Sequence, residues 1–342
     1  MNLTCIPNVG FFDSPEFVSL SLHIVTVFSA PIHLFGAYCI LIKTPEQMKS
    51  VKWYMFTFHI WTVLFDLSLS FLVIPFILAP AAAGYPLGVL QWFGIPTIAQ
   101  MLLTLTFFAY MSISIVSLFE NRFFVICEFP GKNIWEHLRK FWLLAHYAGD
   151  IFALIPVAWL VPDQETAVKV VYQKLPCLPK YIYEAPIFVI ADDTTYHLII
   201  SFVTTCICVL QISLFCFCLV WNIFKQLKAR TMSQRTFEMQ KKFLTALVIQ
   251  CSVPFFILIF PLLYFLFSVL ANYYNQALVN FAFITGSIHG VVSTGTMVAL
   301  HKPYRDTLVS MLFKSTNNTV ESSRRDFMNT SFHNNSLVPI NS

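Results

Sequence analysis

The chain has few charged side chains for its length. Asp, Glu, Lys and Arg make up 11% of its 342 residues, and 57% of the residues are hydrophobic. A soluble protein carries about 25% charged residues. So few charges cannot cover a water-exposed surface, so the composition excludes an ordinary soluble domain and predicts a membrane protein. We expect no nucleic-acid partner and no cofactor.

Other features are also missing. The first 17 residues, MNLTCIPNVGFFDSPEF, contain no Lys or Arg. They therefore lack the basic region of a cleavable signal peptide, and we expect the first apolar segment to stay in the mature protein. Nine cysteines, most of them inside apolar runs, do not form a disulfide scaffold. No internal repeat is present, which gives no support to an inverted-repeat transporter.

Long apolar runs recur seven times along the chain. Each is long enough to cross about 30 Å of hydrocarbon as a helix of roughly 20 residues. Helices are required because an open strand edge in lipid leaves backbone polar groups without partners. The sequence therefore predicts an all-α seven-helix transmembrane bundle. The predicted spans are 17–42, 53–79, 94–118, 141–161, 197–224, 243–270 and 278–300.

The basic residues are distributed unevenly between the two sides of such a bundle. Alternate loops and the C-terminal tail hold 18 of the 21 Lys and Arg residues, and the other side holds only Lys169, Lys174 and Lys180. Short loops rich in Lys and Arg stay in the cytoplasm. We therefore expect the N-terminus outside and the C-terminus in the cytoplasm.

The segments that flank the bundle differ in character. Residues 1–16 form the predicted extracellular N-terminus, 17–305 the bundle, and 306–342 a cytoplasmic segment. Within that segment Leu308, Met311 and Leu312 recur at helical spacing, which predicts a short amphipathic helix on the inner leaflet that contacts membrane lipids. The Ser-, Thr- and Asn-rich tail beyond it is expected to be disordered.

Asp66 is an acidic residue within the second predicted span. A carboxylate at this depth is unfavourable by roughly 2.5–3.5 kcal/mol, so it should face the bundle interior, near Ser68 and Ser70. His59, seven residues earlier, lies on nearly the same helix face. Two interpretations remain open: a conformational switch that holds a cation or changes protonation, and a buried hydrogen-bonded group that orders the bundle.

The triplet Glu120, Asn121 and Arg122 ends the third predicted span. An acid beside a base can form a local ion pair that holds one conformation, and the arginine can contact a partner protein when the helices separate. The alternative is a plain anchor, because cations are favoured at a helix C-terminus.

Two cysteines fall on the predicted outer side. Cys5 and Cys177 predict one disulfide between the N-terminus and the long loop after the fourth span, with two free thiols as the alternative. Asn2 begins an N-glycosylation sequon on the same side.

Seven spans with this orientation, a charged triplet after the third span and a surface helix after the seventh resemble a G-protein-coupled receptor. The motifs are not those of the rhodopsin-like family. The seventh span contains no NPxxY sequence, no cysteine stands at the outer end of the third span, and no lysine lies within the seventh span to form a retinal Schiff base.

Several runs resemble a narrower family, the nematode serpentine receptors of class H, with class I as a related alternative. The runs are VKWY (51–54), FHIW (58–61), FDL (65–67), SLFENRF (117–123), LPCLP (175–179), STGT (293–296) and HKPYR (301–305). The resemblance implies a chemosensory receptor in the plasma membrane of sensory-neuron cilia that signals through a heterotrimeric G protein. Coupling or switching roles fall on Asp66, Glu120, Asn121, Arg122, His301, Lys302, Pro303, Tyr304 and Arg305.

We therefore expect a receptor for a small odorant or soluble molecule and no enzyme activity. Depth and polarity place the ligand in the outer half of the bundle or under the long outer loop. The expected lining residues are Gln100, Met101, Thr104, Tyr264, Asn280 and Phe283. The alternatives are a ligand-gated seven-helix channel, which would place the N-terminus inside, and a transporter or membrane enzyme that uses the Asp and His residues of the spans.

Overall fold

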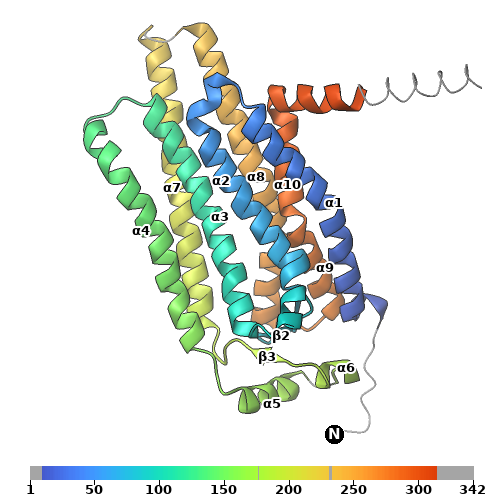
Figure 1. The fold of residues 1–342 in the computed structure, drawn as a ribbon. Helices are drawn as coiled ribbons and strands as arrows, with labels where there is room; N and C mark the ends of the chain where they lie inside the picture. The colour runs from blue at the N-terminus through green and yellow to red at the C-terminus, as the bar shows by residue number, and fades with distance from the viewer. Residues whose placement is uncertain (1–9, 176, 231–232, 314–342) are drawn as a thin grey trace, which may run out of the picture.

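The structure is a computed structural model that describes residues 10–175, 177–230 and 233–313. Seven of its helical segments are long and apolar enough to cross a membrane, and they run side by side as a bundle (Figure 1). This confirms the predicted seven-helix fold. The segments are Pro15–Ile42 (α1), Lys49–Leu67 (α2) continued by the π-helical Ser68–Leu72 (η3), Thr97–Ile126 (α3), Lys132–Trp159 (α4), Thr195–Lys228 (α7), Gln234–Ala271 (α8), and Gln276–Ser287 with His289–Leu300 (α9 and α10).

The outer faces of the helices are apolar. Trp159 of α4 is 81% exposed, and Phe202 and Leu210 of α7 are each 70% exposed. In water such a surface would drive aggregation, whereas in a bilayer it faces acyl chains. The burial pattern thus agrees with the membrane class that the composition predicted.

One end of the bundle carries a small antiparallel sheet, and we call it the sheet end. Its strands are Pro75–Ile77 (β1), Ala83–Pro86 (β2) and Phe188–Val189 (β3), in the order β1-β2-β3, with Phe76 opposite Tyr85 and Gly84 opposite Phe188. Gln164–Lys174 (α5) and Lys180–Tyr183 (α6) cover this end (Figure 1). Short 3₁₀ turns lie at Phe11–Asp13 (η1) and Val89–Phe93 (η4).

The sheet changes one predicted boundary. The second span was predicted to continue to residue 79, but its helix ends at Leu72 and Pro75 begins β1. Proline has no N–H for a helical hydrogen bond and disfavours a helical residue before it. Ile74, the residue before it, has a positive φ of 45°. The apolar run 73–79 therefore belongs to the core beneath the sheet, where Ile74, Phe76 and Leu78 are buried.

The opposite end holds most of the basic loops, and we call it the basic end. The short 3₁₀ turn Glu46–Met48 (η2) lies there, and α7 and α8 extend beyond the predicted spans towards the turn that joins them. After α10 the chain bends sharply, and residues 302–313 form a helix across the bundle axis (Figure 1). This confirms the predicted helix after the seventh span. The predicted tail beyond it lies outside the described residues.

Candidate functional site

Asp66 lies at a junction of three helices. Its Oδ2 atom is 3.0 Å from Nε2 of His33 on α1, and its Oδ1 atom is 2.9 Å from Nδ1 of His289 on α10. All three side chains are at most 5% exposed. Nδ1 of His33 also lies 3.1 Å from the hydroxyl of Thr294 on α10. We call Asp66, His33 and His289 the carboxylate–histidine cluster.

The cluster depends on a close approach between α10 and α2. Gly290 packs so tightly against the Asp66 carboxylate that a Cβ atom at this position would overlap its oxygens. His59, on α2 like Asp66, lies 3.0 Å from the backbone oxygen of His33 through its Nε2 atom. The STGT run contributes Thr294 to this junction, one helical turn after Gly290, the residue that permits the close packing.

The sequence located Asp66 correctly in the bundle interior but did not identify its partners. The Ser68 and Ser70 hydroxyls donate to the backbone oxygens of Phe65 and Asp66 and do not bind the carboxylate. His33 and His289 were visible only as scattered histidines on different spans. The presence of a histidine on each of two other spans was the signal that could have identified them. Only the folded arrangement of the helices shows that the three side chains meet.

Glu120 forms its ion pair with a different helix from the one predicted. Its Oε2 atom is 2.7 Å from Nη2 of Arg139 on α4, and its Oε1 atom accepts a 2.8 Å hydrogen bond from the indole N–H of Trp135. Arg139 also donates to Asn121 Oδ1 at 3.2 Å. Glu120 and Asn121 therefore attach α3 to α4, and the Arg122 side chain takes no part in this contact.

Arg122 is buried without a carboxylate partner among the described residues. Its guanidinium lies 3.7 Å from the ring centre of Phe243 on α8, and the side chain is 4% exposed. Its Nε and Nη2 groups make no hydrogen bond with the described residues. An arginine held on an aromatic face, with free N–H groups, is a strong donor site once the helices around it separate.

The HKPYR run begins the helix at residues 302–313. Tyr304 is fully buried, and its hydroxyl lies 2.7 Å from the Thr44 hydroxyl, which anchors the run beside α1. His301 is also buried, and burial, together with the charge of nearby Arg122, lowers the pKa of its imidazole to about 4. Lys302 and Arg305 are exposed, and Pro303 is half-buried. Two of the five predicted residues are thus available to a partner in this conformation.

The predicted ligand-lining residues occupy the sheet-end half. Gln100 is buried and donates to Ile95 O, and the Tyr264 hydroxyl donates to Asn275 O. Asn280 accepts from Gln276 and donates to Phe12 O, while Phe283 packs between two apolar clusters. Thr104 donates to Gln100 O, and Met101 is half-buried. In the described part of the chain, no side-chain hydrogen bond joins the α3 members to the others.

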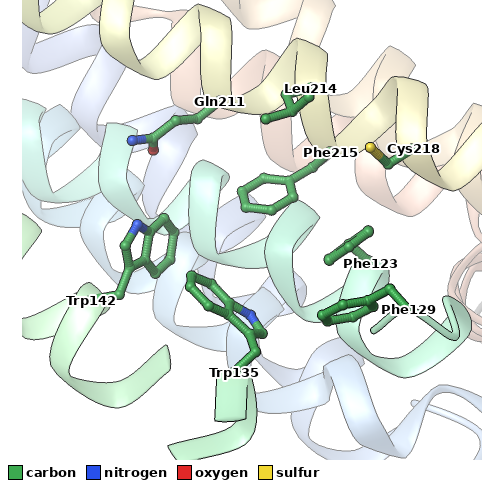
Figure 2. A pocket seen from close by; sticks show the side chains of 8 residues that line it. All are labelled: Phe123, Phe129, Trp135, Trp142, Gln211, Leu214, Phe215 and Cys218. Atoms are coloured by element: carbon green, nitrogen blue, oxygen red, sulfur yellow. The ribbon is translucent and has the colours of Figure 1, made fainter. Parts of the chain in front are cut away.

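Neither of two cavities in the described part of the chain is lined by those six residues. The larger, of about 370 Å³, lies between α3, α4 and α7 in the basic half. Its lining residues are Phe123, Phe129, Trp135, Trp142, Gln211, Leu214, Phe215 and Cys218. Figure 2 shows the rings of Trp135, Trp142, Phe123 and Phe129 facing Phe215 of α7. This cavity fits an apolar molecule.

The second cavity, of about 250 Å³, lies at the sheet end. The β1–β2 turn, α5, the segment before α7 and the end of α8 form its walls, and it contains both apolar and charged groups. Representative lining residues are Ala82, Val171, Lys174, Asp192 and Val269. Several of its lining residues belong to the long loop after the fourth span.

Cys177 forms a disulfide. Its predicted partner Cys5 and the predicted sequon at Asn2 lie outside the described residues. In the described part of the chain no group of three or more His, Cys, Asp or Glu side chains is arranged to hold a metal ion.

The bundle defines a seven-helix membrane protein. The solved structure of squid rhodopsin has a similar fold, with a TM-score of 0.57 over 92% of this chain and 91% of that chain at 9% sequence identity. At this identity the likeness concerns the fold alone.

The sequence comparisons are more specific. The profile of the family described as "Serpentine type 7TM GPCR chemoreceptor Srh" matches residues 13–314. The chain is also 28% identical over 316 residues to Serpentine receptor class H-72 of Caenorhabditis elegans, which covers 91% of this chain and 90% of that protein. The chain belongs to the Srh family of seven-transmembrane chemoreceptors.

Proposed function

We propose that the chain is a chemosensory receptor that binds a small molecule and signals to a heterotrimeric G protein. The observation that carries this proposal is Arg122 at the basic end, a buried guanidinium that is held on the ring of Phe243 and whose Nε and Nη2 groups have no hydrogen-bond partner among the described residues. Arg122 lies on α3 and Phe243 on α8, so a movement between these helices exposes the guanidinium. The family and the fold support a receptor role for this movement.

The basic end is the proposed surface for the G protein. Lys302 and Arg305 are exposed in the first turn of the helix 302–313, and the ends of α7 and α8 beside the turn that joins them carry further basic residues. A surface of this charge fits an acidic partner segment and anionic lipid headgroups. In this proposal the basic end faces the cytoplasm and the receptor resides in the plasma membrane of sensory cilia.

The sheet end is the proposed place for the chemical stimulus. The six predicted residues of α3, α8 and α9 lie in the sheet-end half of the bundle, and α5 forms one wall of the 250 Å³ cavity. Either position lets a ligand alter how the sheet-end halves of the helices pack. The ligand must bind one bundle arrangement better than the other in order to signal.

Asp66 is the proposed switch residue between these ends. Asp66 lies on α2, and its carboxylate contacts α1 and α10. A change in its partners therefore alters the packing of three helices together. An ionisable group inside a membrane bundle is by default a functional candidate.

A cell reporter assay tests the proposed function. The receptor is co-expressed with a panel of Gα subunits and exposed to a library of volatile and water-soluble compounds. We expect at least one compound and one Gα subunit to give a concentration-dependent response, and Arg122→Ala to abolish it at unchanged surface expression. Lys169→Ala removes an exposed cation at the opposite end and serves as the control. Full signalling by Arg122→Ala would contradict the proposed role of this residue.

Orientation is tested separately with an N-terminal epitope tag. Antibody binding on intact cells, together with glycan on Asn2, is the expected result. A tag that is accessible only after permeabilisation would exclude the proposed coupling surface and favour the ligand-gated channel.

A further inference from the structure

Asp66 is a buried acid without a lysine or arginine among its described partners. Its contacts are the rings of His33 and His289, and no Lys or Arg forms a described ion pair with it. An ionised carboxylate in a membrane interior is strongly unfavourable unless a positive charge compensates it. The compensating charge must therefore come from a bound cation or from a proton within the carboxylate–histidine cluster.

The surroundings of His289 define its protonation. Nδ1 lies 2.9 Å from Asp66 Oδ1 and 3.0 Å from the backbone oxygen of Gly286. Both neighbours are acceptors, so Nδ1 carries a hydrogen. Nε2 is buried and has no partner among the described residues, and a second hydrogen there would be an unpaired donor. These contacts fit a neutral His289 ring with its hydrogen on Nδ1.

His33 differs from His289 because both of its ring nitrogens have partners. Nε2 lies 3.0 Å from Asp66 Oδ2, and Nδ1 lies 3.1 Å from the Thr294 hydroxyl. A hydroxyl both donates and accepts hydrogen bonds. His33 can therefore carry hydrogens on both nitrogens, with each one donated to an oxygen. It is the member of the cluster that accommodates a positive charge.

We propose that Asp66 and His33 together hold one proton, which makes the cluster neutral and takes the place of a metal counter-ion. The proton lies on His33 as an imidazolium or on the carboxyl group of Asp66, and the 3.0 Å contact between His33 Nε2 and Asp66 Oδ2 joins the two groups. The proposal deepens the proposed switch role of Asp66 by naming the ligand held there. The presence of the shared proton does not depend on the proposed receptor function. Only the effect of that proton on signalling rests on it.

The packing around the carboxylate disfavours a metal ion. Ring nitrogens lie close to both oxygens, and Gly290 packs so tightly against the carboxylate that a Cβ atom on this residue does not fit. The titratable side chains at the junction are His33 of α1, His59 and Asp66 of α2, and His289 of α10. His59 lies against the backbone oxygen of His33, so it adds no ligand to the carboxylate.

A proton at this position couples three helices. While it is bound, α1, α2 and α10 pack around a neutral group. Once it leaves, the carboxylate is an uncompensated charge, and the close contact with Gly290 becomes unfavourable. A movement of α10 away from α2 therefore accompanies release of the proton to water.

Spectroscopy on the purified protein in lipid nanodiscs tests the proposal without any ligand or G protein. Measurements are made at about two pH units above the ordinary histidine pKa of roughly 6.5, where exposed histidines are neutral. Histidine ¹⁵N NMR reports an imidazolium, and infrared spectroscopy reports a protonated carboxyl group. We expect one of these two signals in the wild-type protein. It should disappear in Asp66→Asn and persist in His23→Gln, which changes an exposed histidine of α1.

Two further variants keep the assignment secure. Asp150→Asn identifies any carboxyl signal that arises from the acid in α4. His33→Gln removes the imidazolium site, and a protonated carboxyl band should then appear, which tests the proposal even when Asp66→Asn does not fold. An ionised Asp66 with only neutral histidines would overturn the proposal. So would a thermal unfolding temperature that rises when sodium replaces choline at constant ionic strength. Either result would leave the reporter assay of signalling unaffected.

Discussion

The guanidinium of Arg122 lies 3.7 Å from the centre of the Phe243 ring, and this contact joins α3 to α8 at the basic end of the bundle. Arg122 is only 4% exposed, and Phe243 is half-buried. A desolvated cation–π contact contributes about 2 kcal/mol. Because Arg122 has no described carboxylate partner, the ring is the main favourable contact that the structure shows for its charge.

Replacement of the ring should release the guanidinium. In Phe243→Leu the cation–π contact is lost while an apolar side chain remains, so the arrangement that buries Arg122 is disfavoured. A loss of about 2 kcal/mol changes its equilibrium constant roughly thirtyfold. We expect ligand-independent signalling to rise in cells that express the receptor with its Gα subunit. Phe256→Leu changes an exposed aromatic residue of the same helix and should leave the basal signal unchanged.

The ion pair between Glu120 and Arg139 should matter for stability. Its side chains are 3% and 14% exposed, and loss of one partner from a buried pair costs about 3–5 kcal/mol. We expect Arg139→Ala to lower the thermal unfolding temperature of the detergent-solubilised protein clearly. Lys169→Ala breaks an exposed pair with Glu165 and should have almost no effect. Equal shifts for the two variants would contradict the role assigned to Glu120 and Arg139.

The sequence predicted the seven helices because hydropathy and loop charge are local signals. It did not predict the partner of Glu120. Arg122 is the basic residue nearest to Glu120 in the sequence, but side chains at positions i and i+2 of a helix point in different directions. Arg139 lies opposite Glu120 across the α3–α4 contact. The sheet end was missed for a similar reason, because the run 73–79 is as apolar as a span and only Pro75 indicates that the helix has ended.

A single glycine should control the approach of α10 to α2. In Gly290→Ala the new methyl group meets the Asp66 carboxylate, so the helices must separate or the carboxylate must turn away from its histidines. We expect a lower unfolding temperature and a lower yield of folded receptor on size-exclusion chromatography. Gly295→Ala introduces the same methyl group where no atom lies within 4 Å, and this variant should behave like the wild type.

His301 should make the stability of the basic end depend on pH. Burial and the charge of Arg122 lower its pKa to about 4, compared with 6.5 for the unfolded chain. Below pH 6.5 the unfolded state therefore binds a proton that the folded state does not, so stability falls as the pH drops from 6.5 towards 4. At the acid end of this window the lowered pKa of His301 reduces the free energy of unfolding by roughly 3 kcal/mol.

Unfolding temperatures measured across that window check this effect. His301→Asn removes the titrating group. The loss of stability on acidification should then be smaller, because unfolding takes up as much as one proton fewer. An unchanged pH profile in this variant would show that His301 does not contribute.

The carboxylate–histidine cluster joins residues that are far apart in the chain. Asp66 stood out because a charge in an apolar run is rare, and its burial followed from the membrane. His33 and His289 lie 33 residues before it and over 200 residues after it, so no spacing rule connects them. Only the packing of α1 and α10 on α2, which Gly290 permits, brings the three side chains together.

The central claim is that Arg122 at the basic end couples this receptor to a G protein. Guanine-nucleotide exchange on a purified heterotrimeric G protein, with the receptor in nanodiscs, tests the claim most directly. Phe243→Leu should accelerate exchange over the wild type, and Arg122→Ala in the same chain should return the rate to that of empty nanodiscs. Acceleration that persists without Arg122, or exchange rates indistinguishable from empty nanodiscs in every variant with every Gα subunit, would contradict it.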